Sequence, residues 1–96
     1  MLFAIITNDK NDALDIRLAA RPDHLAYLDK LGQSLVFAGP FLDEDGQPNG
    51  SLVVIEAASL EQAKEIAAAD PYKRAGLFES SNVRAWKWLL NNNEGR

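Results

Sequence analysis

Six stretches of the chain have strand-like or helix-like hydrophobic patterns, and their order restricts the fold more than any other feature of the sequence. Short apolar and β-branched runs bounded by turn-forming residues predict strands, whereas apolar residues that recur every three or four positions predict helices. The order is strand, helix, strand, strand, helix, strand, over residues 2–7, 13–31, 34–42, 51–56, 60–69 and 77–90. This order predicts an α+β domain in which both helices lie on one face of a four-stranded antiparallel sheet.

The βαββαβ order is the split arrangement of ferredoxin-like domains. With 96 residues, the chain has the size of one domain with one modest core. We expect residues 1–96 to form a single domain with an ordered core over about residues 2–90 and a frayed polar end. Because 47% of the residues are hydrophobic and 25% are charged, disorder is not expected.

Pro22 predicts an interruption in the first helical stretch. Proline lacks a backbone N–H and biases the preceding Arg21 away from helical backbone angles, so we expect the helix to break there. A second helical piece would then begin at Pro22 and end at Gly32. Within this piece His24 is followed by apolar residues three, four and seven positions later, which predicts that the imidazole lies on or beside the inward-facing side.

Turn-forming residues mark the remaining boundaries. Gly39-Pro40 interrupts a strand-like run and indicates a bulge or an edge strand, and residues 43–50 predict a loop between two strands. Ser59, with a glutamine three positions later, has the pattern of a helix-capping box. Asp70-Pro71 ends this second helix, and residues 72–76 are expected to form a loop.

The predicted topology brings His24 and Asp70 together. If the crossovers have their usual handedness, the helices run antiparallel, and the start of the first lies near the end of the second. An imidazole oriented by a carboxylate is a common general acid or base, so both residues are candidate catalytic groups. The pattern also fits a packed, hydrogen-bonded histidine and an aspartate that only ends a helix.

Arg17 and Arg21 lie four residues apart shortly before His24. They would therefore share one side of a helix. Two guanidinium groups in this position could bind an anionic group of a substrate, or they could only solvate the helix.

A metal site is not expected, because His24 is the only histidine and the chain has no cysteine. Asp43, Asp45 and Gly46 have the beginning of a calcium-loop pattern, but the later acidic ligand is missing, so a hairpin turn is the better interpretation. No motif for an organic cofactor is present either.

Charge and composition disfavour several other classes of protein. Ten basic and fourteen acidic residues give a net charge of −4, and the basic residues are scattered, so nucleic acid is not an expected partner. The absence of cysteine excludes disulfides and cysteine nucleophiles and fits the cytoplasm. The first six residues are apolar, but this run is too short for a signal sequence or a membrane span.

The second face of the predicted sheet needs a cover, because both helices lie on the other face. Trp86 and Trp88, two positions apart in the last strand-like run, would point to one face of the sheet. They could form a ligand-stacking surface, a dimer contact or part of the core. A homodimer that packs sheet against sheet would cover the open face.

Several short motifs, taken in order, resemble those of a known family. They are Arg21-Pro22-Asp23-His24-Leu25, Ala38-Gly39-Pro40, Gly50-Ser51-Leu52, Asp70-Pro71-Tyr72, Ala75-Gly76-Leu77-Phe78, and Val83-Arg84 with Trp86-Lys87. Each motif alone is unspecific, but the ordered set resembles the YCII-related domain family, specifically its short YciI-like bacterial branch. The resemblance extends from Leu2 to Trp88.

The resemblance implies a ferredoxin-like fold that dimerises through its sheets, as in dimeric α+β barrels. It also implies an active site centred on a histidine and an aspartate, at the positions of His24 and Asp70. Tyr72, in the same motif as Asp70, joins Arg17 and Arg21 as a candidate substrate-binding residue. Relatives include a dehydrochlorinase that acts on a chlorinated hydroxyquinol, and the wider superfamily contains muconolactone isomerases and monooxygenases.

These observations favour a cofactor-free enzyme of lyase or isomerase type that acts on an unidentified small molecule through a His–Asp dyad. An alternative is a non-catalytic dimeric module that binds a small metabolite in the same pocket. A third interpretation is an accessory subunit that functions through its dimer face.

Overall fold

Four strands form one antiparallel sheet in the computed structural model, which describes residues 1–96. The strands are β1 (Leu2–Asp9), β2 (Leu35–Leu42), β3 (Pro48–Glu56) and β4 (Phe78–Trp86). They lie in the order β2-β3-β1-β4, and every pair is antiparallel. The predicted ferredoxin-like α+β fold is therefore confirmed, and β2 is an edge strand, as Gly39-Pro40 indicated.

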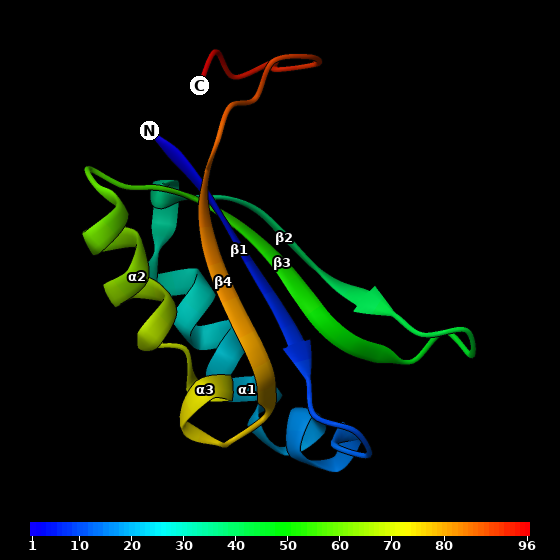
Figure 1. Ribbon diagram of the computed structural model, residues 1–96. Coiled ribbons are helices and arrows are strands. Elements are labelled where there is room, and N and C mark those ends of the chain that lie inside the picture. Colours follow the sequence, from blue (N-terminus) through cyan, green and yellow to red (C-terminus); the bar gives the residue numbers. More distant parts are fainter.

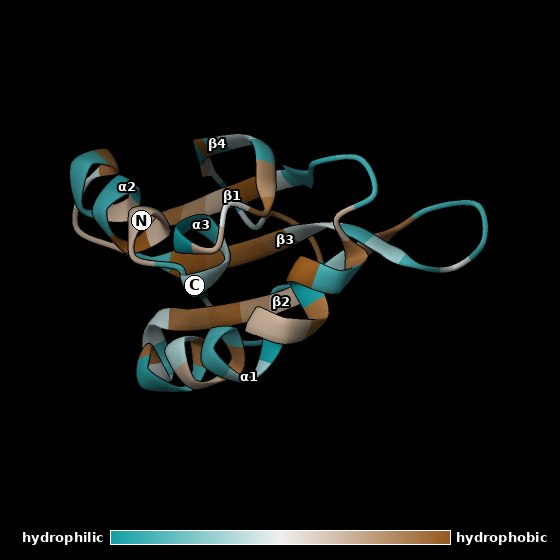
Figure 2. Cartoon of the chain, turned by 90° about the horizontal axis from the view of Figure 1, so that it is seen from below, coloured by the Kyte–Doolittle hydropathy of each residue, from teal (hydrophilic) through white to brown (hydrophobic).

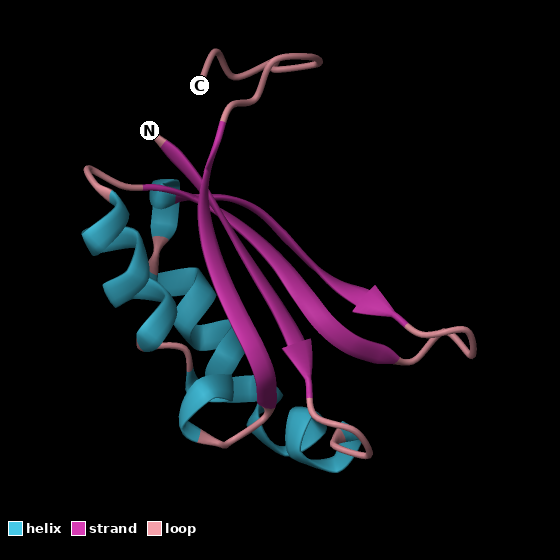
Figure 3. Ribbon diagram, in the orientation of Figure 1, coloured by secondary structure: helices cyan, strands magenta, loops and turns pink.

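The helices cover one face of this sheet (Figures 1 and 3). They are α1 (Leu14–Lys30), α2 (Leu60–Ala68), the short α3 (Pro71–Arg74) and one 3₁₀ turn, η1 (Gly32–Ser34). None of them combines the length and the apolar character that crossing a membrane requires. The main core lies between helices and sheet and contains Phe3, Ile5, Leu28, Val53, Ile55, Ala57 and Ala63.

The colouring in Figure 2 agrees with this layering. The central strands β1 and β3 are largely hydrophobic, whereas α1 and α2 mix hydrophobic and hydrophilic residues along their length. This is the pattern expected of helices that bury one side against a sheet and expose the other to water.

The predicted break at Pro22 is wrong, because α1 continues through the proline. The missing N–H leaves the carbonyl of Leu18 without its usual helical donor. Both Leu18 and Pro22 are exposed, so water can bind that carbonyl. Buried residues on both sides of the proline, Arg17 and His24, hold the two halves of the helix against the domain. His24 therefore lies within a helix and not at its start.

Part of the predicted loop over residues 72–76 is helical. Asp70 is the N-cap of α3, and its side chain accepts a hydrogen bond from the backbone N–H of Tyr72. A proline at the first position of α3 suits a helix start, since its missing N–H would have no helical partner there. Asp70 thus follows α2 and begins the next helix. The predicted cap of α2 at Ser59 is confirmed.

Strand boundaries also differ from the prediction, most clearly in β3 and β4. β3 begins earlier, at Pro48, and β4 ends at Trp86 rather than at Leu90. Beyond Trp86 the chain turns, and the indole N–H of Trp88 donates a hydrogen bond to the carbonyl of Leu90. This local bond gives the Leu90 carbonyl a partner outside the sheet.

The open face of the sheet, opposite the helices, carries a second apolar cluster. Leu2, Ala4 and Val54 are buried there under larger side chains. The rings of Trp86 and Trp88 are stacked with centroids 6.2 Å apart, and Phe37 makes edge contacts with both. The two tryptophans therefore share one face, as predicted, although Trp88 lies beyond the end of the strand. Phe37 and Trp86 are 38% and 39% exposed, so this cluster remains partly open to solvent.

Candidate functional site

His24 and Asp70 are in direct contact, as the topology predicted. Nδ1 of His24 lies 2.8 Å from Oδ1 of Asp70, and both side chains are buried. An ionised carboxylate can only accept hydrogen bonds, so the proton of a neutral His24 ring belongs on Nδ1. Nε2 then carries the lone pair, and it makes no hydrogen bond within the chain. The geometry can therefore support proton transfer at Nε2.

Tyr72 fixes the plane of the imidazole. Its ring is stacked on that of His24, with centroids 3.9 Å apart and 13° between the planes. Burial raises the pKa of the Tyr72 hydroxyl above its usual range; Asp70 adds to this effect, and Arg17 and Arg21 oppose it. The phenol consequently stays neutral near pH 7.

Arg17 is held in a buried network that joins α1 to two strands. Its Nε and Nη2 donate hydrogen bonds to the two carboxylate oxygens of Asp9, at 2.7 and 3.1 Å. Nη2 also lies 3.0 Å from the carbonyl of Gly50 and 3.0 Å from Oγ of Ser51. Position 50 requires glycine, because a Cβ there would lie 2.6 Å from the carbonyl oxygen of Thr7. The guanidinium also lies over the Tyr72 ring, 4.7 Å from its centroid.

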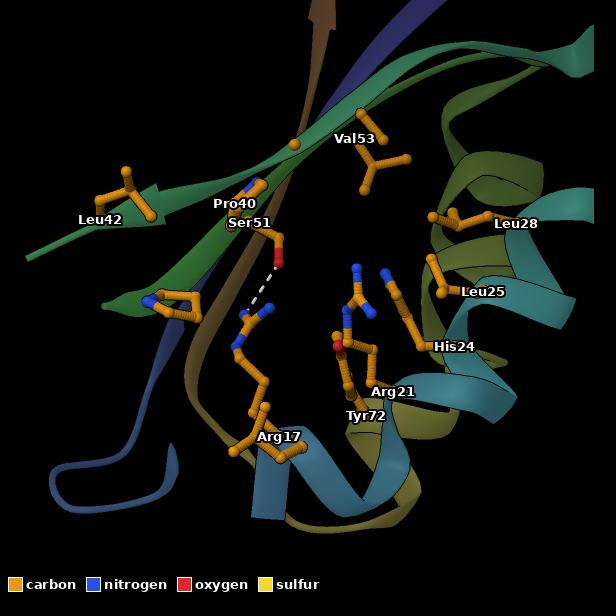
Figure 4. Close-up of a pocket in the computed structure, with 14 residues that line it drawn as sticks. Arg17, Arg21, His24, Leu25, Leu28, Pro40, Leu42, Ser51, Val53 and Tyr72 are labelled. Carbon is orange, nitrogen blue, oxygen red and sulfur yellow. Dashed lines mark hydrogen bonds between the residues drawn. The ribbon is translucent and has the colours of Figure 1, made fainter. Parts of the chain in front are cut away.

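These residues border a pocket of about 380 Å³ between α1 and the β2–β3 hairpin. This volume is near the lower end of the range for small-molecule sites, roughly 300–1,000 Å³. Figure 4 shows Arg21 and His24 pointing from α1 toward the strands that carry Pro40 and Val53. The lining residues are Arg17, Leu18, Arg21, His24, Leu25, Leu28, Ala38, Gly39, Pro40, Leu42, Pro48, Ser51, Val53 and Tyr72.

The pocket contains four of the five residues singled out in the sequence, and Asp70 lies directly behind His24. Arg21 differs from Arg17 in being exposed and in making no ion pair or hydrogen bond through its side chain. No group of three His, Asp or Glu side chains is arranged to hold a metal ion.

Sequence reasoning did not find the opposite wall of the pocket or the partners of Arg17. Pro40 and Ser51 belong to motifs that supported the family resemblance, so those motifs were the available signal for this wall. Nothing in the sequence marks Asp9 as a partner of Arg17. Its role depends on the strand register and on Arg17, which are both tertiary features.

Tyr27 is a further residue that the sequence did not single out as functional. Its hydroxyl donates a hydrogen bond to the carbonyl of Ile66 and so connects α1 with α2. Burial raises its pKa well above the usual range, and the nearby carboxylate of Asp70 raises it further. Tyr27 therefore supports the wall behind the His24–Asp70 pair.

Comparisons with known proteins identify the family. Residues 1–87 match the model of the YCII-related domain. Protein YciI of Escherichia coli O6:H1 is 41% identical over 95 residues, covering 91% of this chain and 97% of the relative. The predicted resemblance is thereby confirmed.

Two solved structures share the fold. One is 5-chloro-2-hydroxyhydroquinone dehydrochlorinase (TftG) from Burkholderia phenoliruptrix in complex with 2,5-dihydroxybenzoquinone. Its TM-score is 0.83 at 34% identity, covering 91% of this chain and 94% of that chain. The other is SnoaB, a cofactor-independent oxygenase from Streptomyces nogalater, with a TM-score of 0.62 at 10% identity, covering 94% and 96%. The likeness to SnoaB concerns the fold alone. The fold that both structures share with this chain is that of the dimeric α+β barrels. This chain belongs to the YCII-related domain family.

Proposed function

We propose that this protein is a cofactor-free small-molecule enzyme of lyase or isomerase type, in which His24 transfers a proton and Asp70 orients the imidazole. The observation that carries the proposal is the His24–Asp70 hydrogen bond of 2.8 Å at the wall of the pocket. It leaves Nε2 as the free nitrogen of an imidazole that lines the pocket, which is the arrangement a general base requires.

The proposed reaction begins with removal of a proton from an O–H or C–H bond of the substrate by Nε2. Asp70 stabilises the imidazolium that forms. The electron pair left on the substrate then has two possible fates. In an elimination it expels a leaving group, which departs with its bonding electrons, and the imidazolium then releases its proton to the leaving group or to water. In an isomerisation it moves within the substrate, which takes the proton back from the imidazolium at another atom.

The dehydrochlorinase relative supports the elimination. Its name describes loss of hydrogen and chloride from a hydroxylated ring compound, and it is 34% identical to this chain. One fold can host different reactions. The transfer of the reaction class from this relative to the present chain is therefore part of the proposal. In the same proposal Arg17, Arg21 and Tyr72 line the part of the pocket in which the substrate lies beside His24.

The proposal is tested by a screen for turnover with 5-chloro-2-hydroxyhydroquinone and related hydroxylated or halogenated ring compounds. For any compound that the wild-type protein converts, His24→Ala should lower kcat by roughly 10²–10⁴-fold. Asp70→Asn should also lower it. The matched control is Asp23→Asn, the same change at an exposed position that does not line the pocket, and it should retain activity.

Full activity of His24→Ala toward every converted compound would contradict the proposed mechanism. If compounds raise the Tm of the wild-type protein without being converted, the alternative of a non-catalytic binding module replaces the enzyme.

We further propose that two copies pair through the open face of the sheet. Its aromatic cluster of Phe37, Trp86 and Trp88 is partly exposed, and partly exposed apolar faces of this kind are typical of protein interfaces. The dimeric α+β barrel fold of the structural relatives supports the same assembly.

A further inference from the structure

We propose that the pocket selects a small anion with an apolar body, that Arg21 binds the anionic group, and that Arg17 only frames the site. This inference rests on the proposed function in placing the substrate in the same pocket. It goes further in naming the chemical class of the substrate and in separating the roles of the two arginines.

Arg17 can offer a ligand only its Nη1, because Nε and Nη2 already donate hydrogen bonds within the chain. Its charge is neutralised by Asp9 through two hydrogen bonds, and Nη2 also contacts Gly50 and Ser51. Only 4% of the residue is exposed. An anion at Nη1 would meet a guanidinium whose charge Asp9 already neutralises in a buried ion pair, so Arg17 attracts an anion less than an unpaired arginine does.

Arg21 lies one helical turn after Arg17 and lines the same pocket. It has no carboxylate within ion-pair distance and no hydrogen bond through its side chain. Figure 4 shows its guanidinium pointing into the space between α1 and the strands. A planar guanidinium with free donors binds carboxylates and similar anions in a bidentate manner.

The charge of the pocket differs from that of the whole chain. The chain has a net charge of −4, yet the lining residues include two arginines and no carboxylate. Asp9 neutralises Arg17, and Asp70 is occupied by His24 and by the backbone N–H of Tyr72. One uncompensated positive charge therefore remains, that of Arg21.

The rest of the pocket selects an apolar body. Seven of the fourteen lining residues are hydrophobic, and three of these, Leu18, Leu25 and Leu28, come from the same helix as the arginine. A volume of about 380 Å³ suits a compound of about one ring. Arg21 and His24 are neighbours on the surface of one helix, because they are three residues apart. An anionic group bound to Arg21 would therefore place the apolar ring of the substrate beside Nε2 of His24.

The test compares acids with their neutral amides in binding experiments that require no turnover. The probes are benzoate with benzamide, and cyclohexanecarboxylate with its amide. Their binding is followed through the NMR signals of the imidazole, which come from the only histidine of the chain. In the wild-type protein we expect the Kd of at least one acid to be lower than that of its amide by roughly tenfold or more.

Arg21→Gln should abolish this preference, because it should weaken binding of the acid and leave binding of the amide nearly unchanged. Arg74→Gln is the matched control, because Arg74 is exposed and lies outside the pocket, and it should retain the preference. Three results would each overturn the inference: equal affinity for acid and amide in the wild type, a preference that survives in Arg21→Gln, or no response of His24 to either acid up to about 10 mM.

The inference and the proposed function can fail separately. If Arg21→Gln abolishes the preference for acids but no compound is converted, the anion site stands and the enzyme proposal falls. If a neutral compound is converted by His24 and acids do not bind, the enzyme proposal stands and the anion site falls.

Discussion

The imidazole of His24 is stacked on the ring of Tyr72, with centroids 3.9 Å apart. Asp70, two residues before Tyr72, supplies the oxygen that binds both Nδ1 of His24 and the backbone N–H of Tyr72. The start of α3 therefore holds the imidazole twice, by a hydrogen bond at its edge and by an aromatic ring against its face. A ring fixed in this way needs little reorganisation when a substrate binds.

The first prediction concerns the tautomer of His24. We expect the neutral ring to carry its proton on Nδ1 in the wild-type protein, because a carboxylate accepts and cannot donate. In Asp70→Asn the amide offers both a donor and an acceptor, so ring protonation at Nε2 should appear. Long-range ¹H–¹⁵N spectra of the single histidine distinguish the two forms. Asp23→Asn should keep the wild-type form, and a wild-type ring protonated at Nε2 would show that Asp70 does not orient it.

The second prediction separates the two arginines by stability. Arg17→Met should lower the free energy of unfolding by about 3–5 kcal/mol, because it leaves Asp9 buried without its partner; both side chains are only 5% exposed. Arg21→Met should change the free energy by no more than about 0.5 kcal/mol, as is usual for an exposed side chain without partners. Urea unfolding measures both values.

A double variant checks the cause of this loss. Asp9→Asn in the Arg17→Met background should recover part of the lost stability, because it removes the unpaired charge. If the stability lost in the double variant equals the sum of the losses in Arg17→Met and Asp9→Asn measured separately, the broken ion pair is not the cause of the instability.

The fold was predictable because each strand and helix has a local hydrophobic pattern that agrees with the whole. The contact between His24 and Asp70 was also predictable, since the topology alone places the first helix near the end of the second. The prediction succeeded although His24 lies within α1 and Asp70 begins α3, because both changes leave the two residues at the same end of the domain.

Features that depend on tertiary packing were not predictable. Local propensity indicated a break at Pro22, whereas burial of Arg17 and His24 on either side keeps the helix continuous. Similarly, only the paired register of β1 and β3 places Ser51 opposite Thr7 and within reach of Arg17. The difference in role between Arg17 and Arg21 therefore became visible only in the structure.

The third prediction concerns alkaline pH. Burial raises the pKa of both Tyr27 and Tyr72, and these are the only tyrosines of the chain. Absorbance at 295 nm should therefore show less tyrosine ionisation in the folded protein than in the unfolded chain near pH 10, where an unfolded chain titrates.

The sign of the effect on stability follows from these raised values. Below pH about 10 the tyrosines keep their protons in both the folded and the unfolded state, and the full stability is present. As the pH rises above the tyrosine pKa of the unfolded chain and through the raised pKa values of the folded protein, this stability is lost. Tyr27→Phe should reduce the loss between about pH 10 and 11, measured by urea unfolding at each pH. An ordinary two-tyrosine titration of the folded protein would contradict the prediction.

The last prediction tests the open face of the sheet, where both tryptophans of the chain lie. If two copies pair there, sedimentation should give the mass of a dimer, and dilution below the dissociation constant should shift the tryptophan emission to longer wavelengths. Phe37→Glu should produce a monomer, because a charge buried in an apolar interface without a partner is strongly unfavourable.

Leu60→Glu is the matched control for this prediction. Leu60 is 42% exposed, close to the 38% of Phe37, but it lies at the start of α2. A glutamate suits the first turn of a helix, so this variant should remain a dimer. If Phe37→Glu and Leu60→Glu have the same mass as the wild-type protein, the open face is not the dimer interface.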